Sequence, residues 1–448
     1  MTGFWCAHAA VGADLRIERA ARIDVAAGRI TGVDAGAVPA AGLTVLDGLV
    51  VGGLANCHSH AFHRALRGRT NGGDSFWSWR EQMYALAAVL DPELMHRLAR
   101  AVYREMALAG ITCVGEFHYL HHGPDGTPYD DPNAMAEALV EAARDAGITI
   151  ALLDTCYLAA GFGEPPTGVQ RRFSDGDADR WAARVSALHA RYAGASDVTI
   201  GAAIHSVRAV PADQLPVVAD WAREHDAPLH VHLSEQPAEN AACLAQHGTT
   251  PTALLAAAGV WGPATTAVHA THLTDGDVTI LGAAGAYVCF CPTTERDLAD
   301  GVGPSVALRA GGARLTLGTD SHAVVDLLEE MRAVELDERL VSGRRGSWPA
   351  PALLAAGTGT AHASLGFGGA GTIEPGARAD LVHVAWDSVR LAGAPVGLDA
   401  LVFAAGAADV RDVVVAGERL VSDGTYASGE DVPAELAAAI DECWRRAR

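Results

Sequence analysis

The chain has 448 residues, half of them hydrophobic and 19% charged, which suits a large, well-buried α/β protein. Its formal net charge of −21 makes nucleic acids and anionic membrane surfaces poor candidate partners. No window of about 18 apolar residues predicts a membrane span. The chain opens without a secretory signal, and its eight cysteines lack a disulfide spacing, so we expect a cytoplasmic protein.

Both ends of the chain are rich in short predicted strands. Residues 1–47 combine β-forming runs with glycine turns, and residues 372–425 show the same pattern. We therefore expect one small β-sheet domain built from both termini, with the boundaries 1–49 and 372–448. The segment between them, 50–371, is the predicted central domain.

In the central domain, apolar strand-like runs alternate with helical stretches, and the first run is LVVGGLANCHSH. Asp91-Pro92 opens one predicted helix and Gly110 closes it, and the same punctuation places another helix between Asp131 and Gly147. Strand-helix units repeated eight times over about 300 residues predict a (β/α)8 barrel of the TIM type. A doubly wound open sheet would also alternate, so this pattern favours the barrel without excluding the sheet.

Histidines and one aspartate stand at the ends of several predicted strands. His58 and His60 alternate at the end of the first strand, so their side chains share one face. The other candidates are His232 on the fifth strand, His269 on the sixth and Asp320 on the eighth. Barrel enzymes build their active sites at these strand ends. We therefore expect one shared metal site, and imidazoles with a carboxylate suit zinc or iron(II).

The chain contains no lysine, since all 33 basic residues are arginine. A carboxylated lysine that bridges two metals is therefore impossible, and we expect a single metal, although a glutamate bridge stays open. His205, at the end of the fourth strand, lies where that lysine would fall. Glu235, three residues after His232, is placed to carry a proton from the attacking water to a leaving nitrogen. Asp320 can bind the metal and also accept a hydrogen bond from water.

Several sequence blocks carry a more specific signal: HSHAFHRAL, FWSWREQMY, EFHYLHH, QRRF, HSVRAV, HLSEQ, HATHL, CPTTERDL and TDSH. Together they resemble the formimidoylglutamate deiminases (N-formimino-L-glutamate iminohydrolases), enzymes of histidine degradation in the amidohydrolase superfamily. The tryptophan-arginine block and HSVRAV are the most specific to this subgroup. The resemblance also suggests a homodimer, for which FWSWREQMY is a candidate aromatic interface.

The resemblance implies a role for each candidate residue. Arginine forks are natural partners for the two carboxylates of such a substrate, which agrees with the implied contacts. The implied zinc ligands are His58, His60, His232 and Asp320; the implied catalytic residues are Glu235, His269 and Asp320; the implied substrate contacts are His63, Arg80, Tyr119, His205 and Arg208.

Two positions depart from the family pattern. His63 stands where the family has glutamine, the residue expected to touch the formimino group. His63 can donate a hydrogen bond in its place, or it marks a shifted substrate. Asp297 stands where asparagine is common, which is a milder change.

Three functions are compatible with these residues. The first is hydrolysis of N-formimino-L-glutamate to N-formyl-L-glutamate and ammonia, in which a metal-activated water attacks the amidine carbon. The second is a mononuclear zinc deaminase of an aromatic base or nucleoside, but a neutral base needs no arginine pair. The third is a non-catalytic barrel, against which the complete ligand set and Glu235 argue.

Overall fold

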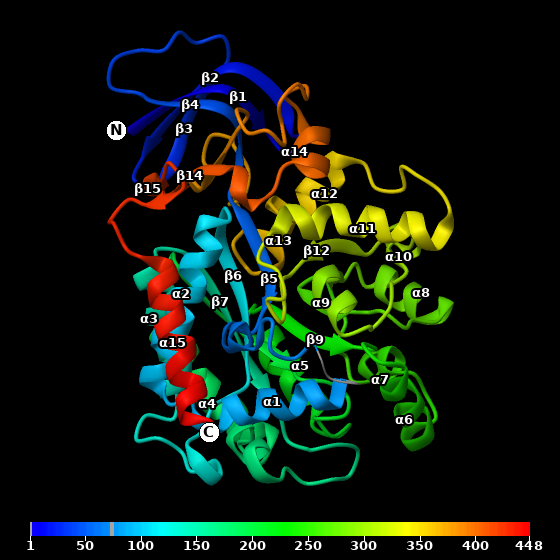
Figure 1. The fold of residues 1–448 in the computed structure, drawn as a ribbon. Helices are drawn as coiled ribbons and strands as arrows, with labels where there is room; N and C mark the ends of the chain where they lie inside the picture. The colour runs from blue at the N-terminus through cyan, green and yellow to red at the C-terminus, as the bar shows by residue number, and fades with distance from the viewer. Residues whose placement is uncertain (1, 72–75) are drawn as a thin grey trace.

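The computed structural model describes residues 2–71 and 76–448, and it contains two eight-stranded sheets (Figure 1). One sheet is entirely parallel, and its strands follow one another in chain order. These strands are β5 (Leu54–Ser59), β6 (Ile111–His118), β7 (Thr149–Cys156), β8 (Val198–Ile204), β9 (Leu229–Leu233), β10 (Thr265–His269), β11 (Tyr287–Phe290) and β12 (Arg314–Leu317).

The parallel sheet curls until its first and last strands meet. The chain after β12 joins the end of β5 through a parallel bridge between Ser59 and Asp320. The backbone N–H of Asp320 donates to the carbonyl of His58 over 2.9 Å, and that of His60 donates to the carbonyl of Asp320 over 3.2 Å. The (β/α)8 barrel predicted from the sequence is thus confirmed, and its seam lies at the predicted metal ligands.

Helices surround this barrel. Asp91 caps α2, since its carboxylate accepts the Leu94 N–H over 2.8 Å, as the sequence predicted. The next helix, α3, begins at Ala134 rather than at Asp131, whose carboxylate instead accepts the Asn133 N–H in a turn before the helix. The helices that follow the strands are α2 (Pro92–Leu108), α3 (Ala134–Ala146), α4 (Ala178–Arg191), α5 (Leu215–Glu224), α6 (Pro237–His247), α7 (Pro251–Ala257), α8 (Asp275–Ala283), α9 (Pro292–Asp297), α10 (Ser305–Gly311), α11 (Leu327–Ser342), α12 (Ala350–Ala356) and α13 (Gly359–Ser364).

The second sheet is formed by both ends of the chain, as expected, and it lies at the top of Figure 1. The run LVVGGLANCHSH is divided between the two sheets, because the chain passes from one to the other at Gly52 and Gly53. A Cβ at Gly52 would overlap the carbonyl of Gly371, and one at Gly53 would overlap the Thr112 hydroxyl, so this passage requires glycine. In sheet order the strands are β16 (Thr425–Tyr426), β15 (Glu418–Ser422), β14 (Val410–Val415), β13 (Leu381–Ala385), β4 (Thr44–Gly52), β1 (Thr2–Val11), β2 (Arg16–Ala26) and β3 (Arg29–Asp34).

The terminal segment also reaches the barrel. Helix α15 (Val432–Arg446), in red, lies beside α2 in Figure 1, where the Trp444 indole donates to the Ala65 carbonyl over 2.8 Å. Helix α14 (Leu398–Ala404) packs on α11 and α12. The domain boundaries drawn from the sequence stay a prediction.

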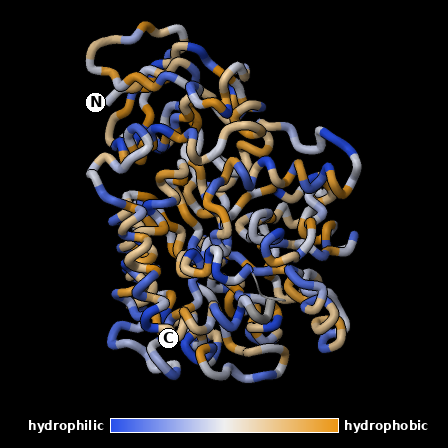
Figure 2. Tube along the Cα trace, in the orientation of Figure 1, coloured by the Kyte–Doolittle hydropathy of each residue, from blue (hydrophilic) through white to orange (hydrophobic). Residues whose placement is uncertain are grey.

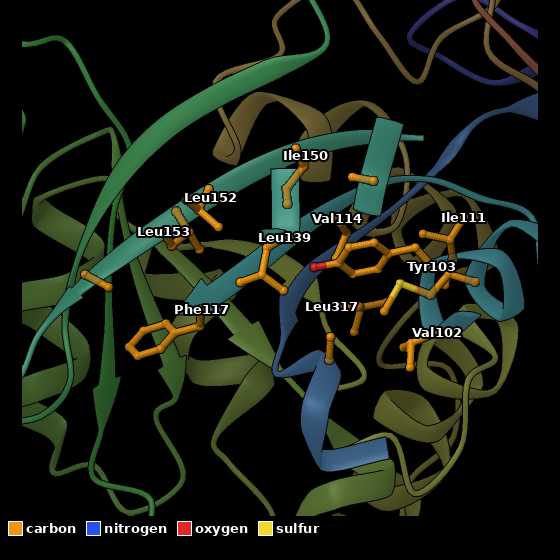
Figure 3. Packing of buried hydrophobic residues seen from close by; sticks show 14 of the residues in the cluster. Val102, Tyr103, Ile111, Val114, Phe117, Leu139, Ile150, Leu152, Leu153 and Leu317 are labelled. Atoms are coloured by element: carbon orange, nitrogen blue, oxygen red, sulfur yellow. The ribbon is translucent and has the colours of Figure 1, made fainter. Parts of the chain in front are cut away.

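The main core lies between the barrel strands and their helices. Every residue of β5, β6, β7 and β9 is buried, and Figure 2 shows hydrophobic segments along the inner strands. In Figure 3, Tyr103 of α2 and Leu139 of α3 pack with Val114 of β6 and Ile150 of β7. None of the helices in the described ranges has the length and apolarity needed to cross a membrane.

Candidate active site

The predicted metal ligands meet at the carboxyl-terminal mouth of the barrel. His58 lies in β5, His60 directly follows it, His232 lies in β9 and Asp320 follows β12. Asp320 has a φ of 44° and His269, at the end of β10, has a φ of 67°. This left-handed region is unusual for residues other than glycine, and such strain is often found at functional sites.

The ring nitrogens of three histidines lie close together, and one carboxylate contacts two of them. The Nε2 atoms of His58 and His232 are 3.1 Å apart. The Asp320 Oδ1 lies 3.3 Å from the His58 Nε2 and 3.4 Å from the His60 Nε2. One donor atom from each histidine lies within 4.8 Å of the others, so a single ion could contact all three.

Backbone carbonyls orient two of these rings. The His60 Nδ1 lies 2.8 Å from the carbonyl of Phe117, and the His232 Nδ1 lies 2.8 Å from the carbonyl of His205. A carbonyl can only accept, so each Nδ1 carries the hydrogen and each Nε2 presents its lone pair to the site. This is the arrangement that metal-binding histidines usually adopt.

The charges of the site fit a divalent cation. Burial lowers the pKa of His58 to about 3, so this ring is neutral at physiological pH. Burial alone would raise the pKa of Asp320, but its close contact with His58 keeps that pKa below its ordinary value. Imidazole lone pairs and a carboxylate that face one another repel unless a cation lies between them. Three nitrogens and one oxygen suit zinc or iron(II).

Glu235 and His269 stand beside the metal ligands. Both side chains are buried and both line the same pocket. Burial raises the pKa of the Glu235 carboxyl. The His269 Nε2 lies 3.9 Å from the Asp320 carboxylate, and its Nδ1 lies 3.3 Å from the Glu295 carboxylate. Burial acts to lower the pKa of His269, but Glu235 and the hydrogen bond to Glu295 raise it well above its ordinary value.

Two buried glutamates that the sequence did not single out support this site. Glu295 accepts the backbone N–H of Cys291 over 2.9 Å in addition to its bond with His269. Glu116 accepts the Ser59 hydroxyl and the Ala61 N–H, each over 2.7 Å, and so holds the segment that carries the first two histidines. Their only sequence signal was membership of the CPTTERDL and EFHYLHH blocks.

The pocket above the metal ligands gathers the predicted substrate contacts. Of the predicted site residues only His58 does not line it, because that ring lies fully buried beneath. The Arg208 Nε donates to the Glu239 carboxylate over 2.8 Å, and the Arg80 guanidinium lies 5.4 Å from the centre of the Tyr84 ring. The lining residues are His60, His63, Trp79, Arg80, Met83, Tyr84, Tyr119, Tyr157, Phe173, His205, Arg208, His232, Glu235, His269, Leu298 and Asp320.

His63 is close to both the metal ligands and the substrate pocket. Its Nε2 lies 2.9 Å from the Tyr119 hydroxyl, and its ring centre lies 4.6 Å from that of His60. The His63 Nδ1 is buried and makes no hydrogen bond within residues 2–71 and 76–448. Asp297, by contrast, is exposed and accepts a hydrogen bond from Asn71 over 2.6 Å.

The tryptophan-arginine block lies on α1 (Phe76–Val89), at the bottom of Figure 1. Trp79, Arg80, Met83 and Tyr84 of this helix line the pocket. The side chains of residues 76–78 lie outside the described set, and the dimer interface predicted for this block stays a prediction.

The closed parallel barrel and the cluster of histidines and aspartate at its mouth are the arrangement of a hydrolase with a candidate metal site. The sequence profile of the Amidohydrolase family matches residues 49–420, and the chain belongs to this family. The formimidoylglutamate deiminase of Pseudomonas aeruginosa is 37% identical over 86% of this chain and 87% of its own length. Among solved structures, an amidohydrolase from Brucella melitensis is 32% identical with a TM-score of 0.91, covering 99% of this chain and 100% of its own.

A second solved structure, of an adenosine deaminase from Xanthomonas campestris with bound zinc, is 25% identical with a TM-score of 0.87. It covers 100% of this chain and 98% of its own. Family membership and these relatives support a hydrolase that acts on a carbon–nitrogen bond.

Proposed function

We propose that this protein hydrolyses N-formimino-L-glutamate to N-formyl-L-glutamate and ammonia, and that one zinc ion serves the reaction. The observation that carries the proposal is the joint presence of Arg80 and Arg208 in a pocket directly above the metal ligands. The protein as a whole carries a formal charge of −21, so a doubly carboxylated substrate needs such local positive charge. The 37% identity to a formimidoylglutamate deiminase supports the same substrate.

The metal is assigned to His58, His60, His232 and Asp320. Donor atoms of the three histidines lie within 4.8 Å of one another, and the Asp320 carboxylate lies 3.3 Å from His58 and 3.4 Å from His60. Lewis-acid activation of water is the chemistry that a divalent ion supplies at such a site. A zinc-bound relative with the same fold makes zinc the first candidate and iron(II) the second.

The protein's own residues handle the protons. Glu235 has a raised pKa and lies in the pocket, so it can take a proton from the attacking water and give it to the departing nitrogen. His269, held by Glu295 on one side, can hydrogen-bond to the developing tetrahedral centre on the other. The amidine carbon gains the water oxygen, the carbon–nitrogen bond to the terminal nitrogen breaks, and ammonia leaves.

The other pocket residues bind the substrate. Arg80, Tyr119, His205 and Arg208 are assigned to the carboxylates, and His63 to the formimino nitrogen. Burial and the charge of Arg208 lower the pKa of His205 well below its ordinary value. The ring is therefore neutral, and its N–H can donate a hydrogen bond to a substrate carboxylate. A role in histidine degradation, a cytoplasmic location and a homodimer belong to the same proposal.

A deaminase of an aromatic base or nucleoside is the second candidate. The likeness to an adenosine deaminase favours it, and the aromatic wall of the pocket could stack a base. The arginine pair argues for the dicarboxylate, because a neutral base gains little from it. A non-catalytic barrel is disfavoured, since the ligands, Glu235 and His269 converge at one pocket.

The product identifies the reaction. The zinc-loaded protein, incubated with N-formimino-L-glutamate, should yield N-formyl-L-glutamate and ammonia in equal amounts by NMR and an ammonia assay. Substrate that stays intact at micromolar enzyme would refute the proposal.

A further inference from the structure

The QRRF run was singled out in the sequence, but the metal chemistry leaves Gln170 without a role. The run forms a 3-10 helix, η3 (Gly168–Phe173), at the edge of the pocket. The Gln170 side chain is buried, and its Nε2 lies 2.9 Å from the Tyr157 hydroxyl and 3.2 Å from the Tyr84 hydroxyl. Both tyrosines line the pocket.

The orientation of the Gln170 amide follows from its other contacts. Its Oε1 lies 3.3 Å from the backbone nitrogen of Thr167 and 3.3 Å from the Thr167 hydroxyl. A backbone N–H can only donate, so Oε1 is the acceptor and Nε2 donates to both tyrosine oxygens. Each phenol oxygen is therefore used as an acceptor by Gln170. Tyr157 and Tyr84 also share a hydrogen bond. One phenol hydrogen is used in it, so the other is left for a ligand in the pocket.

The surroundings of these hydroxyls suit an anion. Arg80 lies over the Tyr84 ring, and Arg208 lines the same pocket as Tyr157, whose ring centre is 4.6 Å from that of His205. Burial raises the pKa of Tyr157, so its hydroxyl stays protonated and able to donate. The only carboxylates among the described residues that line the pocket are Glu235 and Asp320, which belong to the metal end.

We propose that the hydroxyl pair of Tyr84 and Tyr157 determines specificity by donating a hydrogen bond to one substrate carboxylate, and that Gln170 is a positioning residue that orients this pair. This inference rests on the proposed function, since it takes the substrate to be a linear dicarboxylate amidine. It adds a hydroxyl pair to the two arginines that line the pocket.

The test compares three amidines: N-formimino-L-glutamate and two analogues, each lacking one of its carboxylates. Tyr157→Phe and Tyr84→Phe should each raise KM for the dicarboxylate about ten- to a hundredfold, the usual effect of losing a hydrogen bond to a charged group. Their kcat should stay within about threefold. The effect on KM should vanish for the analogue that lacks the carboxylate these hydroxyls bind. Tyr129→Phe is the matched control, because its hydroxyl contacts Arg172 of the same η3 but does not line the pocket.

Gln170 is tested through a double-mutant cycle. Gln170→Leu should raise KM in the parent but add nothing in the Tyr84→Phe/Tyr157→Phe background, because it acts only through the two hydroxyls. The inference alone would be overturned if Gln170→Leu raised KM equally in both backgrounds. It would also be overturned if the tyrosine variants left KM unchanged, or if they raised it equally for all three amidines. A parent that turns over none of the three amidines would overturn the proposed function, and this inference with it.

Discussion

Asp320 is bound to His58 twice: its backbone N–H donates to the His58 carbonyl over 2.9 Å, and its carboxylate Oδ1 lies 3.3 Å from the His58 Nε2. The first bond closes the barrel between β12 and β5, and the second brings two metal ligands together. The contacts that close the barrel therefore also bring two of the proposed metal ligands together.

This geometry predicts one tightly held divalent ion in each chain. The proposed shell has three imidazoles and one carboxylate, and the chain has no lysine to bridge a second metal. Elemental analysis of protein purified without added metal should give one equivalent, and removal by a chelator should abolish activity until zinc is restored. Two equivalents that are both required for turnover would contradict this prediction.

Glu235 should be required for turnover but not for metal binding, because it lines the pocket and is not among the residues that converge on the metal. Glu235→Gln should keep its metal and its melting temperature and lose activity by roughly 10²–10⁴-fold, as expected for a lost general acid/base. Steady-state kinetics and elemental analysis on the same preparation provide the measurement. Turnover within threefold of the parent would show that another group carries the proton.

Arg208→Met should weaken use of the dicarboxylate. Loss of a charge-assisted contact costs about 1.5–3 kcal/mol, or roughly ten- to a hundredfold in kcat/KM. Because Arg208 also pairs with the buried Glu239, Glu239→Gln is the matched control that disturbs the pair and keeps the arginine. An unchanged kcat/KM in Arg208→Met would leave the arginine a purely structural role in its pair with Glu239.

His63 should orient the amidine. His63→Gln should retain substantial activity on N-formimino-L-glutamate, since glutamine can both donate and accept and can keep a hydrogen bond to Tyr119. His63→Ala should lose much more, because neither contact survives. Equal, near-parental kcat/KM in both variants would make His63 a bystander.

A buried ion cluster behind the site predicts acid sensitivity. Arg184 lies 2.7 Å from the Asp154 carboxylate and 2.9 Å from that of Asp175. Burial acts to raise the pKa of Asp154, but the charge of Arg184 holds it below its ordinary value. The folded pKa is thus below the unfolded value of about 3.9, so this stabilisation is present above pH 4 and is lost as the pH falls further.

Arg184→Met should therefore destabilise the protein at neutral pH by about 3–5 kcal/mol, since it removes the guanidinium partner of two buried carboxylates, Asp154 and Asp175. Its melting temperature should begin to change at a higher pH than that of the parent, because the charge of Arg184 no longer lowers the pKa values of Asp154 and Asp175. Melting curves between pH 7 and pH 3 test this. Coincident curves for parent and variant would contradict it.

The sequence was sufficient to predict where the proposed ligands lie, because strand alternation and the common orientation of parallel strands bring His58, His232 and Asp320 to one mouth. It did not predict that Glu295 contacts His269 or that Gln170 contacts the two tyrosines. Glu295 and Gln170 lie in segments that follow the strands, and the path of such segments depends on tertiary packing. It also merged β4 and β5 into one run, because apolar residues continue on both sides of the glycines where the chain changes sheets.

The most direct test of the proposed function is the ratio of kcat/KM for N-formimino-L-glutamate to that for guanine, cytosine and adenosine, measured by ammonia release from the zinc-loaded protein. The arginines and hydroxyls of the pocket predict that the dicarboxylate amidine exceeds each base by at least about a hundredfold, the effect expected when a charged group loses its partners. Faster ammonia release from any of the bases would contradict the deiminase and identify the protein as a base or nucleoside deaminase.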